Sequence, residues 1–227
     1  MQSTRVSGDW VVGVALCVLL GSAVARADKA RIPPQPKPAQ AYEMVDAHPQ
    51  EHVTIAAEPG DSKAARPNTR LDYLGHQMMP VRVIVTNDSE FTVTLDDARI
   101  HLITADNTVL PAATLDDLQR RMFTLKSATG TKIPLGLPIP ITVGKSNIDR
   151  KITQDDDDFG FKTTEVKPHA TVAGWLYYDM QGTDQPFLGH ATLELKHVRF
   201  VGNGQVLDSF EIQLRPAKDA NGDAGKQ

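Results

Sequence analysis

The first stretch whose residue types could do chemistry is His48-Pro49-Gln50-Glu51-His52, which has the H-x-x-E-H spacing of one class of zinc peptidases. In those enzymes two histidines on one face of a helix bind zinc, and the glutamate polarises the metal-bound water. Pro49 disfavours helical geometry at His48, so His48 could at most cap a helix and could not share a face with His52. The residues that follow, HVTIAAEP, favour a strand. The sequence therefore predicts a chance match and no metal site.

Four consecutive carboxylates, Asp155 to Asp158, form the second candidate. Such a run is solvated or binds a hard cation such as calcium, because adjacent like charges repel one another. In a calcium loop that starts at Asp155, Asp157 and Gly160 stand at required positions, but two further ligand positions hold apolar residues. We therefore expect a solvated acidic loop. The calcium candidates that stay open are Asp155, Asp156, Asp157 and Asp158.

The third candidate is the aromatic pair in the stretch GWLYYD, where Trp175 and Tyr177 share one side of an expected strand. If they are exposed, the two rings could form a platform for a sugar or for a partner protein. However, Leu176 and Tyr178 make the opposite side apolar as well, which is typical of a central strand covered on both faces. The sequence favours the buried interpretation and leaves Trp175 and Tyr177 as candidate binding residues.

The sequence contains no motif for nucleophilic catalysis or cysteine chemistry in the part that we expect to remain. The chain contains neither a G-x-S-x-G nucleophile elbow nor an S-x-x-K pair, and we predict no catalytic residue. Cys17 is the only cysteine, and it lies in a segment that we expect to be removed. The mature chain would then have no disulfide, thiolate nucleophile or cysteine-based zinc site. The sequence therefore predicts a protein that is not an enzyme and that needs no cofactor.

The first residues have the pattern of a secretory signal peptide. Arg5 lies in a polar start, the apolar run WVVGVALCVLL follows, and the segment closes on ARA, which ends at Ala27 and matches an A-x-A cleavage signature. The run is shorter than the about 20 apolar residues that a helix needs to cross a bilayer. We therefore expect cleavage after Ala27 and export to the periplasm or the extracellular space. An uncleaved membrane anchor and lipid attachment at Cys17 are the alternatives.

Removal of the first 27 residues leaves 200, which is enough for one sizeable domain. The removed segment contains Arg5, Arg26 and Asp9, so the net charge changes from −4 to −5. No cluster of basic residues follows the chain, and we expect no nucleic-acid partner. Four prolines within residues 33–38 favour a stiff, extended spacer, which we place at 28–50. A folded domain is expected at 51–215 and a disordered tail at 216–227.

The folded region is dominated by a period of two residues, in which β-branched and polar side chains alternate. This pattern is typical of strands that place one face on a core. In ATLELKHVRF the apolar phase slips near Lys196 and His197, which indicates a β-bulge. One segment differs: TLDDLQRRMFTLK has apolar residues at helical spacing, and its first residue, Thr114, can act as the N-cap. We predict strands at 80–87, 91–95, 98–104, 170–180, 191–200 and 206–214, and one inserted helix at 114–126.

Many short strands with turn signals between them predict an all-β, antiparallel β-sandwich. The stretches VRVIVTNDSEFTVTLDDARIHLITADNTVL and VKPHATVAGWLYYDM resemble the core hairpin and a later strand of immunoglobulin-like domains found in secreted bacterial proteins of unknown function. The resemblance covers residues 77–215. It implies an immunoglobulin-like sandwich that serves as an extracytoplasmic interaction or scaffold domain, and it implies no catalytic residue.

The function that these observations favour is an exported, non-catalytic domain that contacts a protein or another component of the cell envelope. Recognition would use an exposed sheet edge or an aromatic patch. A calcium-dependent or carbohydrate-binding module is one alternative, and a hydrolase with an unrecognised site is another. After signal cleavage we expect no transmembrane segment.

Overall fold

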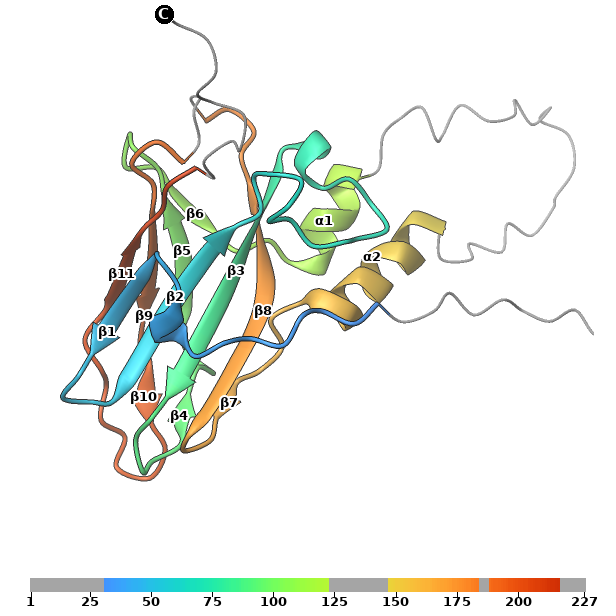
Figure 1. The fold of residues 1–227 in the computed structure, drawn as a ribbon. Helices are drawn as coiled ribbons and strands as arrows, with labels where there is room; N and C mark the ends of the chain where they lie inside the picture. Colours follow the sequence, from blue (N-terminus) through green and yellow to red (C-terminus); the bar gives the residue numbers. More distant parts are fainter. Residues whose placement is uncertain (1–30, 123–146, 184–187, 217–227) are drawn as a thin grey trace, which may run out of the picture.

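The structure is a computed structural model that describes residues 31–122, 147–183 and 188–216. The predicted signal peptide and all but the first residue of the predicted C-terminal tail lie outside these residues. The described chain is mostly β-structure with two α-helices (Figure 1). None of the helices in these three segments has the length and apolar character needed to cross a membrane.

The strands form three antiparallel sheets. Sheet 1 has the order β1 (Val45–His48), β2 (Val53–Pro59), β3 (Met78–Asn87) and β8 (Ala170–Asp179). Sheet 2 has the order β11 (Phe210–Gln213), β9 (Thr192–Lys196), β5 (Arg99–Ile103) and β6 (Val109–Pro111). Sheet 3 is small and has the order β10 (Arg199–Phe200), β4 (Val93–Thr94) and β7 (Glu165–Val166).

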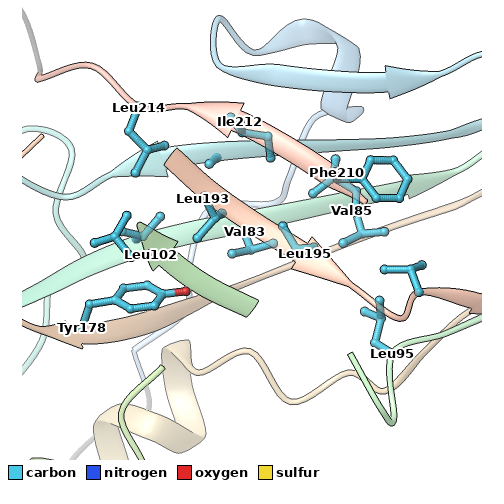
Figure 2. Close-up of a cluster of buried hydrophobic side chains, with 14 of the residues drawn as sticks. Val83, Val85, Leu95, Leu102, Tyr178, Leu193, Leu195, Phe210, Ile212 and Leu214 are labelled. Atoms are coloured by element: carbon cyan, nitrogen blue, oxygen red, sulfur yellow. The ribbon is translucent and has the colours of Figure 1, made fainter. Parts of the chain in front are cut away.

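Sheets 1 and 2 enclose one hydrophobic core, and apolar residues of sheet 3 extend this core at one end. The alternation predicted for β3 is confirmed, because Val83 and Val85 point into this core. Figure 2 shows them with Leu193 and Leu195 of β9. Tyr178 of β8 and the apolar residues of β11 belong to the same cluster. The arrangement is therefore sandwich-like, as the period of two residues predicted.

The opposite face of sheet 1 is also covered. Met78 of β3 and Trp175 and Tyr177 of β8 point away from the core. Their side chains pack against α1 (Leu115–Met122) and α2 (Asn147–Phe159). Both helices lie beside β3 and β8 in Figure 1. As a result every residue of β3 is buried, which is the behaviour of a strand with structure on both sides.

The predicted helix at 114–126 is confirmed over its described part, α1. The side-chain oxygen of Thr114 accepts a hydrogen bond from the backbone N–H of Asp117 at 3.2 Å, and the carboxylate of Asp117 accepts one from the backbone N–H of Thr114 at 2.9 Å. This reciprocal pair is a capping box, which satisfies two backbone donors at the start of the helix. Residues 123–126 lie outside the described residues.

The prediction of only one helix was wrong, because Asp155 to Asp158 lie on the second helix, α2, and do not form a solvated loop. The buried side of α2 carries Ile148, Ile152, Asp155 and Phe159, of which Ile148 is only partly buried. These residues follow the helical spacing of a buried stripe. An aspartate at one of the four positions concealed the periodicity in the sequence.

The predicted spacer at 28–50 also needs correction. Its second half contains the 3-10 helix η1 (Ala39–Ala41) and the strand β1, so sheet 1 starts before residue 51. The segment 31–44, blue in Figure 1, runs from α2 along the outer face of sheet 1 to β1. Ala39 is buried against Ile84 of β3, and Arg82 donates a hydrogen bond to the backbone oxygen of Pro34 at 2.9 Å. This part of the Pro-rich segment is therefore part of the domain.

At Lys196 and His197 the structure shows a change of sheet, where the sequence predicted a β-bulge. β9 ends at Lys196 and pairs with β5 and β11, whereas β10 starts at Arg199 and pairs with β4. His197, between them, has a left-handed φ of 61°. The slip in apolar phase thus marks the point where the chain leaves sheet 2 for sheet 3.

We expect Leu193→Ala to lower the free energy of unfolding by about 3 kcal/mol, because it removes buried atoms from the centre of the core and leaves a cavity. Val109 on β6 is 53% exposed, so Val109→Ala is the control and should change stability by about 0.5 kcal/mol or less. Urea unfolding of a chain that begins at residue 28 measures both values. Equal losses in the two variants would contradict the assignment of the core.

Candidate functional site

The H-x-x-E-H stretch spans the turn of the hairpin that β1 and β2 form. His48 is the last residue of β1 and pairs with Val53 of β2, and His52 lies in the turn with a left-handed φ of 55°. The ring of His48 stacks on the ring of Phe210 with 3.8 Å between centroids. The strand predicted after His52 is confirmed, so the two histidines lack the shared helix face that a zinc peptidase needs. Among the described residues, no three His, Cys, Asp or Glu side chains are grouped so that they could hold a metal ion.

Trp175 and Tyr177 share one side of β8, as predicted, and that side is the outer face of sheet 1. Both rings are buried under the helical layer. The ring of Tyr177 lies 4.5 Å from the ring of Tyr73, which precedes the 3-10 helix η2 (Leu74–His76). Neither ring is presented as an exposed platform, and the two residues serve as the floor on which α1 and α2 pack.

The acidic run of α2 contains the most deeply buried charge in the described part of the chain. The side chain of Asp155 has no exposed surface, and that of its partner Arg70 is 3% exposed. Both carboxylate oxygens of Asp155 accept hydrogen bonds from the backbone N–H of Arg70, at 2.9 and 3.0 Å. The guanidinium of Arg70 donates a third bond at 2.9 Å, and the hydroxyl of Tyr73 donates a fourth at 3.3 Å.

Asp158, one turn further along α2, extends this network to the start of the described chain. Its carboxylate accepts hydrogen bonds from the guanidinium of Arg70 at 2.7 Å and from the backbone N–H of Arg31 at 3.0 Å. The guanidinium of Arg31 in turn donates to the backbone oxygen of Asn68 at 2.6 Å. Three segments that are distant in sequence are thereby joined: residues 31–38, the connection between β2 and β3, and α2.

The charged groups in this network stabilise the charged forms of their partners. Burial alone would favour the neutral forms, but the hydrogen bonds from Arg31 and Arg70 outweigh it and lower the pKa of Asp158. Burial also tends to lower the pKa of Arg70, but the carboxylates of Asp155 and Asp158 outweigh this effect and raise the pKa of the guanidinium. Arg70 and Asp158 therefore stay charged at neutral pH. Such a pair fixes how α2 sits on sheet 1, because breaking it leaves an uncompensated buried charge.

The other two carboxylates of the run have a different partner. The ammonium of Lys162 lies 3.1 Å from the carboxylate of Asp156 and 2.5 Å from that of Asp157. The hydrogen bond to Asp157 is the main cause that raises the pKa of Lys162. All four aspartates therefore have a basic partner, which the sequence alone did not indicate.

A cleft of about 630 Å³ lies against the connection between β2 and β3, and we call it the loop cleft. The volume is within the range of small-molecule sites. Its lining residues come mainly from this connection, and β3 and β8 add Pro80 and Tyr177. The hydroxyl of Tyr177 is buried and has no hydrogen-bond partner among the described residues. No feature of the sequence indicated this cleft.

A second feature lies at the end of the molecule where β4, β7 and β10 are found (Figure 1). Three large apolar side chains in the segments next to β4 and β10 are exposed, and we call them the apolar loop end: Phe91, Val201 and Val206. Phe91 is 53% exposed, although the alternation of FTVTL predicted it to face the core with Val93 and Leu95. β4 covers only Val93–Thr94, so Phe91 lies in the loop before it. Its ring lies 5.7 Å from that of Phe200.

The loop that carries Phe91 is held by the turn at residues 87–90, where Asn, Asp and Ser side chains favour a turn. The side-chain nitrogen of Asn87 donates hydrogen bonds to the backbone oxygens of Phe91 at 2.7 Å and Val166 at 2.9 Å. The side-chain oxygen of Asn87 accepts hydrogen bonds from the backbone N–H and the hydroxyl of Ser89. Asn87 is fully buried, so the exposed ring is attached to a well-fixed backbone.

Both edge strands of sheet 1, β1 and β8, contact other segments of the described chain. On one side the backbone N–H of Glu211 in β11 donates to the carboxylate of Asp46 in β1 at 2.8 Å. On the other side the backbone oxygens of Trp175 and Tyr177 accept hydrogen bonds from the N–H groups of Phe161 and Ala113. Recognition through a free edge of sheet 1 therefore has little support in the geometry.

Comparisons of the chain with protein-family models, curated proteins and solved structures found no match.

We expect Asp155→Ala to lower the free energy of unfolding by about 3 kcal/mol, because it leaves the buried guanidinium of Arg70 with one carboxylate fewer. The matched control is Asp157→Ala on the exposed side of the same helix, whose side chain is 63% exposed; it should cost about 0.5 kcal/mol. Chemical denaturation of both variants and of the parent chain gives the comparison. A loss in Asp157→Ala as large as that in Asp155→Ala would show that the buried pair does not anchor α2.

We expect millimolar calcium to leave the melting temperature of a chain that begins at residue 28 unchanged. The oxygens of Asp155 already accept four hydrogen bonds, and the remaining aspartates of the run pair with Arg70 or Lys162. Thermal unfolding in calcium and in a chelator measures the effect. A rise in melting temperature that disappears when Asp156 and Asp157 are replaced by asparagine would contradict this expectation and would support the calcium-dependent alternative.

Proposed function

We propose that the chain is an exported, non-catalytic interaction domain of the cell envelope, with an immunoglobulin-like β-sandwich that binds a protein partner through its apolar loop end. The observation that carries this proposal is Phe91, a large aromatic side chain that is 53% exposed on a loop fixed by a buried asparagine. Aromatic residues held rigidly at a surface are typical anchors of protein interfaces, because they bury a large area at a small cost in conformational entropy.

The immunoglobulin-like fold is supported by two antiparallel four-stranded sheets that share one core. In such sandwiches the loops gather at the two ends of the sheets, where they are free to vary and to bind. The apolar loop end is one of these ends. Export is supported by the signal-like pattern of residues 1–27.

The interaction surface that fits best is the loop end and not a sheet edge. The edges of sheet 1 are covered by β11, Ala113 and Phe161, and β6 ends in Pro111, which cannot donate a backbone hydrogen bond. Three of the seven large apolar residues that are exposed in the described chain belong to the apolar loop end. Phe91 and Val201 lie in neighbouring segments, since the backbone N–H of Val201 donates to the backbone oxygen of Thr92 at 2.8 Å.

The proposal that the domain is not an enzyme and needs no cofactor is supported by the roles of the candidate residues. The ring of His48 stacks on Phe210, and the carboxylate of Asp155 is bound by Arg70 and Tyr73. Trp175 and Tyr177 support the helical layer. Each of these groups has a structural task that accounts for its position.

The test uses the mature chain, immobilised through its C-terminus and exposed to solubilised envelope proteins. We expect Phe91→Ser to reduce the recovery of the bound partner at least tenfold, which is about the loss of 1.4 kcal/mol of binding free energy. Val109→Ser is the matched control, because Val109 on β6 is also 53% exposed; it should retain the partner.

Thermal unfolding must show that both variants stay folded, since a loss of recovery through unfolding would be uninformative about the surface. Equal recovery from the parent chain, Phe91→Ser and Val109→Ser would contradict the proposed surface. Binding that Val109→Ser abolishes, but Phe91→Ser does not, would move the surface to β6.

A further inference from the structure

We propose that the loop cleft is a binding site for a small organic anion with a flat apolar body, such as an aromatic carboxylate or sulfonate. The inference goes beyond the protein interface proposed above, because it concerns a different part of the molecule and a different class of ligand. Three observations carry it: the connection between β2 and β3, the apolar walls of the cleft, and the charges on its rim.

The connection between β2 and β3 is much longer than the topology requires. The two strands are antiparallel neighbours in sheet 1, with Pro59 paired to Val81. Two residues can join such strands, yet the chain uses residues 60–77 and forms only the short 3-10 helix η2 within them. Long connections with little secondary structure of their own are uncommon in compact domains and are usually functional.

This long connection is fixed along its length. Gly60 passes so close to sheet 1 that an added Cβ would lie 2.8 Å from Pro80 and 3.0 Å from the ring of Trp175. In the middle, the backbone of Asn68 is bound by Arg31, and Arg70 is bound by Asp155. A wall that is already held in place lowers the entropy cost of binding a ligand.

The walls of the cleft contain aromatic and apolar side chains at its base. Tyr73, Pro80 and Tyr177 line it and are all buried. The rings of Tyr73 and Tyr177 lie 4.5 Å apart and are tilted by 38°. Only the small accessible parts of these rings line the cleft, and an apolar group of a ligand can pack against them.

The rim of the cleft carries more positive than negative charge. Lys63 and Arg66 line the cleft and are exposed, and Asp72 is the only carboxylate among the lining residues. The guanidinium of Arg66 lies 3.5 Å from the carboxylate of Asp72, and Lys63 has no ion pair with another described residue. The aspartates of α2 are not among the lining residues. The excess is local, because the whole chain has a net charge of −4.

These three features together select the ligand. Positive groups at the mouth of a cleft attract an anion and can form charge-assisted hydrogen bonds to its oxygens. The apolar base then accommodates the body of the ligand, so neither a small inorganic anion nor a neutral hydrocarbon uses both parts of the site. A carboxylate or sulfonate attached to an aromatic ring uses both.

The mature chain offers an internal reporter for the test. Of the two tryptophans in the sequence, Trp10 lies in the predicted signal peptide, which leaves Trp175. Trp175 lies beside Gly60 at the start of the long connection, since a Cβ added to Gly60 would lie 3.0 Å from its ring. The probes are anilinonaphthalene sulfonate, an aromatic anion, and phenylnaphthylamine, which has the same rings without the sulfonate. Energy transfer from Trp175 to each probe reports binding to the folded domain, and the variants below locate the site.

We expect anilinonaphthalene sulfonate to bind the folded chain at one saturable site and to quench the emission of Trp175. Replacement of Lys63 and Arg66 by glutamine should weaken this binding about tenfold, because two charged donors are lost. Binding of phenylnaphthylamine should be weaker in the parent chain and unchanged in this variant. The matched control replaces Lys167 and Lys196, which are exposed elsewhere, by glutamine and should leave both probes unaffected.

Three results would overturn the inference. The first is no saturable binding of the sulfonate to the folded parent chain. The second is an equal loss in the cleft variant and in the control variant, which would indicate the effect of total charge. The third is a loss in Phe91→Ser but not in the cleft variant, which would place the probe at the apolar loop end. Since Phe91→Ser tests the proposed protein interface separately, the two proposals can fail independently.

Discussion

The constraint on which this structure depends is that β3 and β8 of sheet 1 carry large apolar side chains on both faces. One face of β3 and β8 faces sheet 2 and forms the core, while the other presents Met78, Trp175 and Tyr177. An exposed surface of this kind would be unfavourable in water, since burial of apolar area is the main driving force of folding. A second layer is therefore required. The helices α1 and α2, the connection between β2 and β3, and the segment 31–44 supply it.

The buried charge network decides how this second layer is placed. Apolar contacts alone are not directional, so α2 could slide or rotate on the face of sheet 1 with a small change in energy. The carboxylate of Asp155 removes this freedom, because a buried charge is tolerated only where its partners complete its hydrogen bonds. Arg70 and Tyr73 complete them in one position of the helix. The cleft beside the network owes its fixed wall to the same bonds.

The backbones of the two proposed binding regions are fixed in a similar way. In each region, buried polar groups fix the backbone. Asn87 holds the loop of Phe91, and Asp155 holds the connection that lines the loop cleft. Rigid loops on a packed scaffold can bind without a large loss of conformational entropy. The sandwich core thus supports both surfaces. None of its residues belongs to the apolar loop end.

The sequence by itself determined the features that depend on near neighbours in the chain. Alternation fixed the core face of β3, Asn87 and Ser89 fixed a turn, and Thr114 with Asp117 fixed the start of α1, because each rule joins residues at most a few positions apart. Only the tertiary structure decided that Asp155 is buried, since its partner Arg70 is 85 residues away. The same holds for the covered face of Trp175 and for the exposure of Phe91. These outcomes depend on which segment packs on which face, and pairing over such distances leaves no periodic signal in a single sequence.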